Sequence, residues 1–211
     1  MRSRQDLGGL SCQLVEVTEL SRIALEHVTA ALCDQGPAAG SCLPDAEKAL
    51  YALHQAIEDQ ALAIGETRVR PATGLRTVVA TAQVNADAEG VGVLARRLVE
   101  IAGSRPSRPA VPAEVQAAVC GMGRVCLEML ALARDAAGSA PADTRAAMGA
   151  ANAELHRLRQ RIYRILLDDL RTVDVDAALD ASLACRYYLQ CAEHAVSMAR
   201  HTALAVQGTP G

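Results

Sequence analysis

Several residue types that carry particular functions are scarce or missing in this chain of 211 residues. It has no phenylalanine and no tryptophan, only four tyrosines, and a single lysine, Lys48. Proteins that hold single-stranded nucleic acid stack its bases on aromatic side chains, and proteins that recognise a nucleotide sequence present a basic surface. Because the net charge is also −3, the chain is predicted not to bind nucleic acid.

Long apolar runs are missing as well. No run approaches the roughly 20 apolar residues that a membrane-spanning helix needs. The opening MRSRQDLGG has arginines but no apolar segment behind them, so it does not match a secretory signal. We therefore expect a cytoplasmic protein.

The cysteines do not form a recognisable metal or redox motif. Their number is odd, and no two are separated by the two residues found in zinc ribbons and thiol–disulfide enzymes. We interpret them as reduced, partly buried thiols that act as small hydrophobic residues, and we do not expect disulfides. They are Cys12, Cys33, Cys42, Cys120, Cys126, Cys185 and Cys191.

Motifs for catalysis are equally hard to find. There is no G-x-S-x-G elbow for a nucleophile and no glycine-rich loop after a strand for a phosphate. Helical di-iron enzymes use Glu-x-x-His motifs, and the nearest candidate, Glu154 with His156, has the wrong spacing. We predict that the chain is not an enzyme.

Apolar residues make up 51% of the chain, and they recur three and four positions apart in six separate segments. This spacing predicts helices with one apolar stripe each. The stripe of the fourth segment is Val115, Val119, Met122, Cys126, Met129 and Ala133. For the third segment we predict a stripe that begins Leu75, Val79, Ala82 and Ala86.

Segments rich in glycine and proline separate the six stripes, and strand patterns are almost absent. The most proline-rich of them, GSRPSRPAVP (103–112), divides the chain nearly in half. The order is two helices and a long helix, then a linker, then the same again. We predict an all-α protein of two tandem three-helix bundles, with repeats at 1–103 and 112–208 and a linker at 104–111.

Four stretches resemble the PhoU family of phosphate-uptake regulators, in order and spacing. The opening MRSRQDLGGLSCQLVEV is similar to the family's first helix. RPATGLRTVVATAQVNADAEGVG (70–92) resembles its third helix, which ends in Asp-x-Glu-x-x-Gly. VPAEVQAAVCGMGRVCLEML (111–130) and RYYLQCAEHAVSMA (186–199) resemble the first and third helices of the second repeat.

The resemblance implies a cytoplasmic adaptor without covalent chemistry or a cofactor. It would couple the ATPase of a phosphate ABC transporter to a sensor histidine kinase and repress the phosphate-starvation response when phosphate is plentiful. We expect a homodimer that meets the membrane only through its partners. Two alternatives stay open: a metal-binding helical-bundle enzyme, and a PhoU-like paralogue that serves another transporter or kinase.

Family members bind metal clusters through a Glu-x-x-x-Asp pair on the third helix of each repeat. Two carboxylates four residues apart lie on one helix face and suit hard cations. This chain keeps Glu89 but has Val93 as its partner, and it keeps Glu193 but has Leu189 before it. Arg97 also adds a positive charge where the family has an asparagine. We therefore expect little metal binding.

The candidate metal residues are a possible remnant only, namely Asp87, Glu89, Glu193 and His194. Neighbours on a helix point about 100° apart, so Glu193 and His194 do not easily hold one ion by themselves. The favoured interpretation is a partly exposed polar strip. The alternative is a residual site in which Glu193 acts with His194 or His201.

Arg157, Arg161 and Arg164 form a basic strip on the fifth predicted helix. Such strips are most often solvated faces that balance acids on neighbouring helices. The functional alternative is a docking strip for an acidic partner surface.

Overall fold

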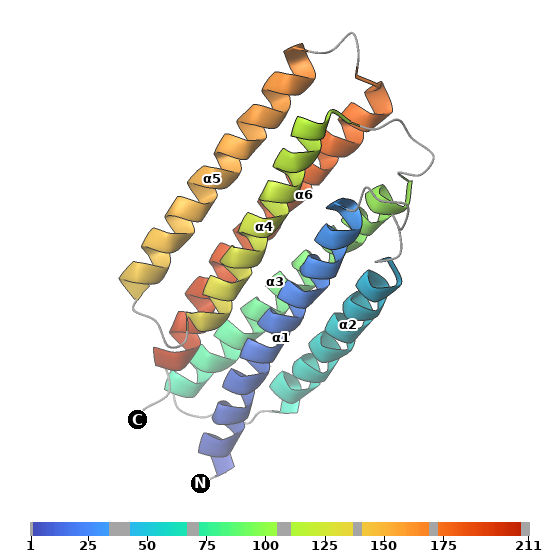
Figure 1. The fold of residues 1–211 in the computed structure, drawn as a ribbon. Helices are drawn as coiled ribbons and strands as arrows, with labels where there is room; N and C mark the ends of the chain where they lie inside the picture. Colours follow the sequence, from blue (N-terminus) through green and yellow to red (C-terminus); the bar gives the residue numbers. More distant parts are fainter. Residues whose placement is uncertain are drawn as a thin grey trace.

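The computed structural model describes residues 2–33, 43–66, 72–104, 111–136, 141–168 and 173–207. The regular structure of these residues is helical throughout, as predicted (Figure 1). The helices are α1 (Arg2–Cys33), α2 (Leu43–Glu66), α3 (Ala72–Ser104), α4 (Ala113–Asp135), α5 (Pro141–Asp168) and α6 (Val175–Gln207).

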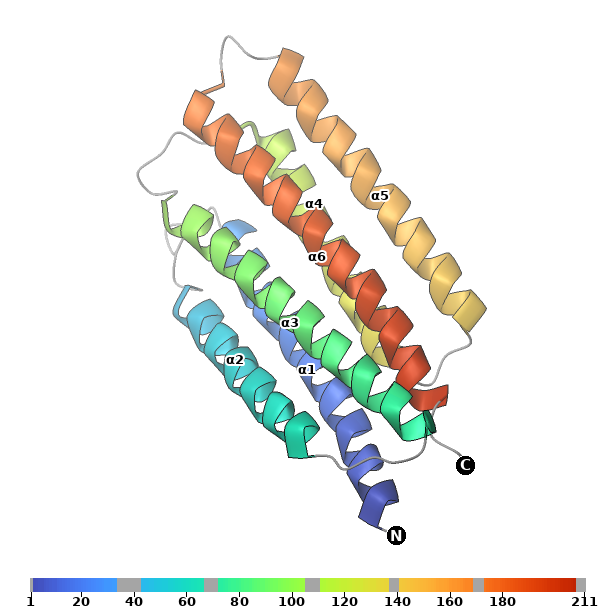
Figure 2. The ribbon, with the colours of Figure 1, turned by 180° about the vertical axis from the view of Figure 1, so that it is seen from behind.

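Four helices form the centre of the protein and two cover it. In the centre, α1 and α6 each contact the other three helices, whereas the described residues of α3 and α4 do not touch each other. Helix α2 packs on α1 and α3, and α5 packs on α4 and α6 (Figures 1 and 2). The predicted pair of three-helix bundles is therefore confirmed. The domain limits stay a prediction, because residues 105–110 of the proposed linker lie outside the described part of the chain.

Local signals explain where two of the second-half helices begin. The Oδ1 atom of Asp174 accepts hydrogen bonds from the backbone N–H groups of Asp176 and Ala177, at 3.0 and 3.1 Å, and so caps α6. At the start of α4 the carbonyl of Pro112 accepts from the amides of Val115 and Gln116. Proline is tolerated at position 112 because a residue at the start of a helix needs no N–H of its own for the hydrogen bonds within the helix.

The core largely follows the predicted stripes. All six stripe residues of α4 are buried, and so are Leu14, Val17, Ala24 and Val28 of α1. Burying one such aliphatic side chain stabilises the fold by about 1.5–3 kcal/mol.

The stripe predicted for α3 was wrong. Leu75 and Val79 are 60% and 51% exposed, and Ala86 is exposed too. Helix α3 touches α1, α2 and α6, so the positions of these three neighbours decide which side of it is buried. More than half of its buried residues are alanine or threonine; the full set in the described part of the helix is Thr77, Ala80, Thr81, Val84, Ala88, Val91, Ala95, Leu98, Ile101 and Ala102.

Among the described helices, α4 is long and apolar enough by length and composition to cross a membrane. In the protein it contacts α1, α5 and α6, and its most apolar window is 61% buried. Its hydropathy is that of a core helix.

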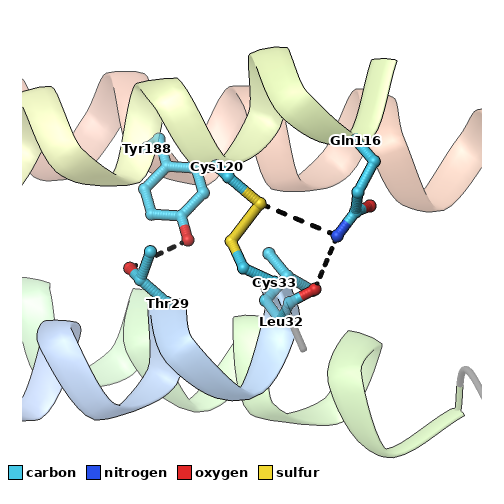
Figure 3. The surroundings of a disulfide bond; sticks show 6 residues. All are labelled: Thr29, Leu32, Cys33, Gln116, Cys120 and Tyr188. Atoms are coloured by element: carbon cyan, nitrogen blue, oxygen red, sulfur yellow. Dashed lines mark hydrogen bonds between the residues drawn. A yellow bond between two sulfur atoms is a disulfide. The ribbon is translucent and has the colours of Figure 1, made fainter. Parts of the chain in front are cut away.

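The expectation of free thiols was wrong for one pair. Cys33 at the end of α1 and Cys120 of α4 form a disulfide that joins the two bundles, with their Cα atoms 5.8 Å apart (Figure 3). Beside it, Gln116 donates a hydrogen bond to the carbonyl of Leu32 at 2.9 Å. Sequence spacing could not find this bond, because the two cysteines are 87 residues apart and meet only when the bundles dock.

Polar contacts extend this junction, which we call the central interface: the contacts of α1 and α3 with α4 and α6. The hydroxyls of Thr29 and Tyr188 share a buried hydrogen bond at 3.0 Å. Arg134 of α4 forms an ion pair with Glu19 of α1 at 2.8 Å. The hydrogen bond from Arg22, and then the bond from Arg134, keep the pKa of Glu19 below its ordinary value. These contacts hold the two bundles together as one body.

The described free thiols, apart from Cys12, are buried in this core, and burial raises the pKa of Cys191 to about 12. In the unfolded chain the same thiol ionises near pH 9. The folded pKa is the higher one, so stability is full below pH 9 and falls as the pH rises toward 12. Between pH 9 and 10, the free energy of unfolding measured in urea should fall by about 1 kcal/mol less for Cys191→Ala than for the wild type. Cys12→Ala, at an exposed thiol, should leave the wild-type pH slope unchanged, and an unchanged slope for Cys191→Ala would contradict the prediction.

Candidate functional site

Asp87 of α3 and His194 of α6 meet across the central interface. The Nδ1 atom of His194 lies 3.0 Å from Oδ1 of Asp87, and the two side chains are 32% and 14% exposed. An ionised carboxylate only accepts hydrogen bonds, so the imidazole donates from Nδ1. Two of the four predicted site residues are thus brought together, one from each repeat.

Gly90 makes this contact possible. A Cβ atom at that position would lie 2.5 Å from both Cε1 and Nε2 of His194. Only glycine therefore leaves room for the imidazole against the backbone of α3. The second oxygen of Asp87, Oδ2, is buried and has no hydrogen-bond partner among the described residues.

Sequence reasoning missed this pair, because it grouped Asp87 with Glu89 and His194 with Glu193 on their own helices. The internal repeat offered a signal. Equivalent helices of two repeats often meet about a two-fold axis, and here α3 and α6 run antiparallel (Figures 1 and 2). Thr77, ten residues before Asp87, donates to the carbonyl of Ala205, eleven residues after His194.

Glu89 and Glu193 point elsewhere, since both are exposed to solvent. Val93, one turn after Glu89, is 56% exposed, so the position that would complete the acid pair is an apolar side chain on the surface. Arg97, one turn further, forms an ion pair with Glu100 at 3.1 Å. Within the described residues no three His, Cys, Asp or Glu side chains come close enough to hold a metal ion. The donor set here does not fit a metal cluster.

We therefore expect the purified protein to carry less than one equivalent of iron or zinc, measured by elemental analysis. The physical reason is the missing carboxylates at positions 93 and 189. Two or more stoichiometric ions would contradict this. As a companion, the double variant Val93→Asp, Leu189→Glu should gain metal, because it places two acids four residues apart on each helix.

The basic strip of α5 is exposed and partly neutralised. Arg157 pairs with Glu154 of its own helix. Arg161 lies 3.5 Å from Glu114 of α4. Arg164 is exposed as well. With two of the three guanidinium groups balanced by acids of the same chain, the geometry favours a solvated face over a docking strip.

Comparison with known proteins identifies the chain along its whole length. The phosphate-specific transport system accessory protein PhoU homolog 2 of Mycobacterium tuberculosis is 30% identical over 205 residues, which cover 97% of this chain and 96% of that protein. The chain belongs to the PhoU family. PhoU homolog 1 of Mycobacterium leprae is 28% identical over 206 residues, covering 97% of this chain and 92% of that protein.

The fold agrees with this assignment. The crystal structure of PhoU from Pseudomonas aeruginosa matches with a TM-score of 0.77 at 19% identity, over 97% of this chain and 99% of that one. No family model matches the chain. The relatives are named accessory proteins of a transport system, which agrees with the prediction that the chain is not an enzyme.

Proposed function

We propose that this PhoU family member is a cytoplasmic accessory protein of a phosphate-specific transport system. It would link the ATPase of a phosphate ABC transporter to a sensor histidine kinase and repress the phosphate-starvation response when phosphate is plentiful. The observation that carries the proposal is the full-length match to relatives named as accessory proteins of a phosphate-specific transport system. The central interface supports action by contact with partner proteins, because a disulfide, an ion pair and a buried hydrogen bond all join the two bundles.

The test is a phosphate-regulon reporter in a strain deleted for this gene and grown with abundant phosphate. We expect high reporter expression that falls again when the wild-type chain is supplied. Purified ATPase and the cytoplasmic part of the kinase should then each bind the protein in a direct assay. Unchanged expression would contradict the proposal unless a second PhoU-like protein also represses the reporter, and the strain described next separates these two cases.

A paralogue that serves another transporter or kinase is the second candidate. It is favoured by the presence of two such proteins, homolog 1 and homolog 2, in Mycobacterium tuberculosis. A strain that lacks every PhoU-like gene separates the two cases. If restoring this chain alone returns the reporter to its repressed level, this chain serves the phosphate system. If only another PhoU-like gene restores repression, this chain is the paralogue.

A further inference from the structure

The first turns of α3 and α5 and the last turns of α6 lie at the same end of the protein (Figures 1 and 2). Two neighbouring hollows lie there. One, of about 380 Å³, lies between α4, α5 and α6, and the other, of about 360 Å³, lies between α3 and α6. Leu204 lines both hollows, so we treat them together as one feature, the terminal groove.

The terminal groove has an apolar floor. In the larger hollow the lining includes Met148 and Ala199, which are buried, with Val196 and Ala203 beside them. The smaller hollow continues this surface over the misassigned stripe of α3, whose leucine and valine are exposed. Leu204, which lines both hollows, is 37% exposed. Contiguous exposed apolar side chains of this kind mark interaction sites.

The rim of the terminal groove is positively charged. Arg145 and Arg200 line the larger hollow and Arg76 the smaller one, and all three are exposed. In the described part of the chain none of them forms an ion pair, unlike Arg157 and Arg161 of the basic strip. The sequence has no acid at 67–86 or at 194–211. On the other side of the larger hollow, Asp135 pairs with Arg134, and Asp143 lies in the first turn of α5, two residues before Arg145. Because the three rim arginines form no ion pair among the described residues, their charge is available to a partner.

We propose that the terminal groove binds an acidic amphipathic helix of a partner protein. Apolar side chains on one face of that helix would enter the hollows beside Leu204, and flanking carboxylates would bind the guanidinium groups of Arg145 and Arg200. Recognition of a helix in a groove uses this combination of apolar anchors and edge charges. The inference extends the proposed function, because it assigns a docking surface to an adaptor that acts through contact.

The shape of the groove favours a protein segment over a lipid bilayer. Surfaces that bind bilayers project apolar side chains outward into the headgroup region. Here the apolar lining of the larger hollow is concave, with Met148 and Ala199 buried at its base. A hollow of about 380 Å³ accepts one or two discrete side chains.

The experiment uses a fluorescein-labelled peptide of about 18 residues, with leucines three and four positions apart and glutamates beside them. Anisotropy is measured with the full-length protein at low and high salt. We expect the double variant Arg145→Gln, Arg200→Gln to weaken binding about tenfold or more, and high salt to weaken binding to the wild type. The matched control Arg157→Gln, Arg161→Gln removes the same charge elsewhere on α5 and should change binding less than about twofold. A peptide with glutamine in place of every glutamate should bind weakly to the wild type and to both double variants.

Leu204→Ser tests the apolar part without altering charge, and it should weaken binding while the circular dichroism spectrum stays unchanged. Equal effects of the two arginine pairs, or equal binding of the glutamine peptide, would overturn the proposal. So would binding to phosphatidylserine vesicles in the absence of peptide binding. The result is independent of the reporter test: a normal reporter response with no peptide binding rejects the groove alone, and peptide binding with an unchanged reporter rejects the phosphate role alone.

Discussion

Serine in place of both Cys33 and Cys120 is expected to lower the free energy of unfolding by about 4 kcal/mol. The two residues are 87 positions apart, and closing a loop of that length removes about 4–4.7 kcal/mol of conformational entropy from the unfolded chain. Typical domains are stable by only about 5–15 kcal/mol. The bond therefore contributes a large share of the stability.

Urea unfolding of the oxidised wild type and of the double serine variant measures this effect. Dithiothreitol should destabilise the wild type by a similar amount and leave the variant unchanged. Cys12→Ser is the matched control, because Cys12 is exposed and unpaired in the described residues. A wild type that is insensitive to the reductant would contradict the prediction.

The same pair can be followed in cells. Rapid acid quenching and alkylation of free thiols, followed by peptide mass analysis, reports how much of the Cys33–Cys120 bond exists before lysis. In the cytoplasm, where we propose that the protein acts, glutathione and thioredoxin keep thiols reduced. Recovery of the linked peptide from quenched cells would show that the bond survives in that environment, and we expect it because Cys33 and Cys120 are only partly exposed.

Gly123→Ala is expected to destabilise the protein by about 1–2 kcal/mol, although alanine is the better helix former. A Cβ atom at position 123 would lie only 2.4 Å from Cγ2 of Thr29 and 3.0 Å from the hydroxyl oxygen of Tyr188. Both neighbours are buried, so overpacking of about 1–3 kcal/mol outweighs the gain of about 1 kcal/mol in helix propensity.

Gly149→Ala is the matched control, since nothing lies within 4 Å of a Cβ atom there and the site is exposed on α5. The same substitution should therefore stabilise the protein by up to about 1 kcal/mol. Adding Thr29→Ser to Gly123→Ala removes the closest atom and should restore part of the loss. Thermal melting compares all three variants, and the same sign of change for Gly123→Ala and Gly149→Ala would contradict the account.

Two helices illustrate how far an apolar pattern predicts burial. In α4 the stripe from Val115 to Ala133 is buried as predicted, because one broad side of that helix faces its neighbours and strong hydrophobic residues mark it. In α3 the larger side chains Leu75 and Val79 were assigned to the core but are exposed. Small residues such as Ala80 and Ala88 occupy the buried side, where they allow close approach of neighbouring helices.

The residues of the candidate site were likewise predicted from the sequence only in part. The resemblance pointed to Asp87 and His194 as residues of interest, and the sequence also showed that the acid pairs of Glu89 and Glu193 are incomplete. Their pairing was not, because it needs α3 and α6 to lie antiparallel and Gly90 to admit the imidazole. Glu89 and Glu193 sit next in sequence to the paired region yet face solvent.

By itself the sequence determined the six helices, their order and the repeated three-helix pattern, because these depend on periodicity and on breakers that act within a few residues. The family resemblance came from four local motifs, which are also read directly from the sequence. Only the tertiary structure decided which contacts join the bundles: the Cys33–Cys120 bond, the Asp87–His194 pair and the terminal groove. Each of these depends on where two helices far apart in the chain lie side by side. Local pattern carries no information on that placement, since it is settled by the shape and burial of the whole four-helix centre.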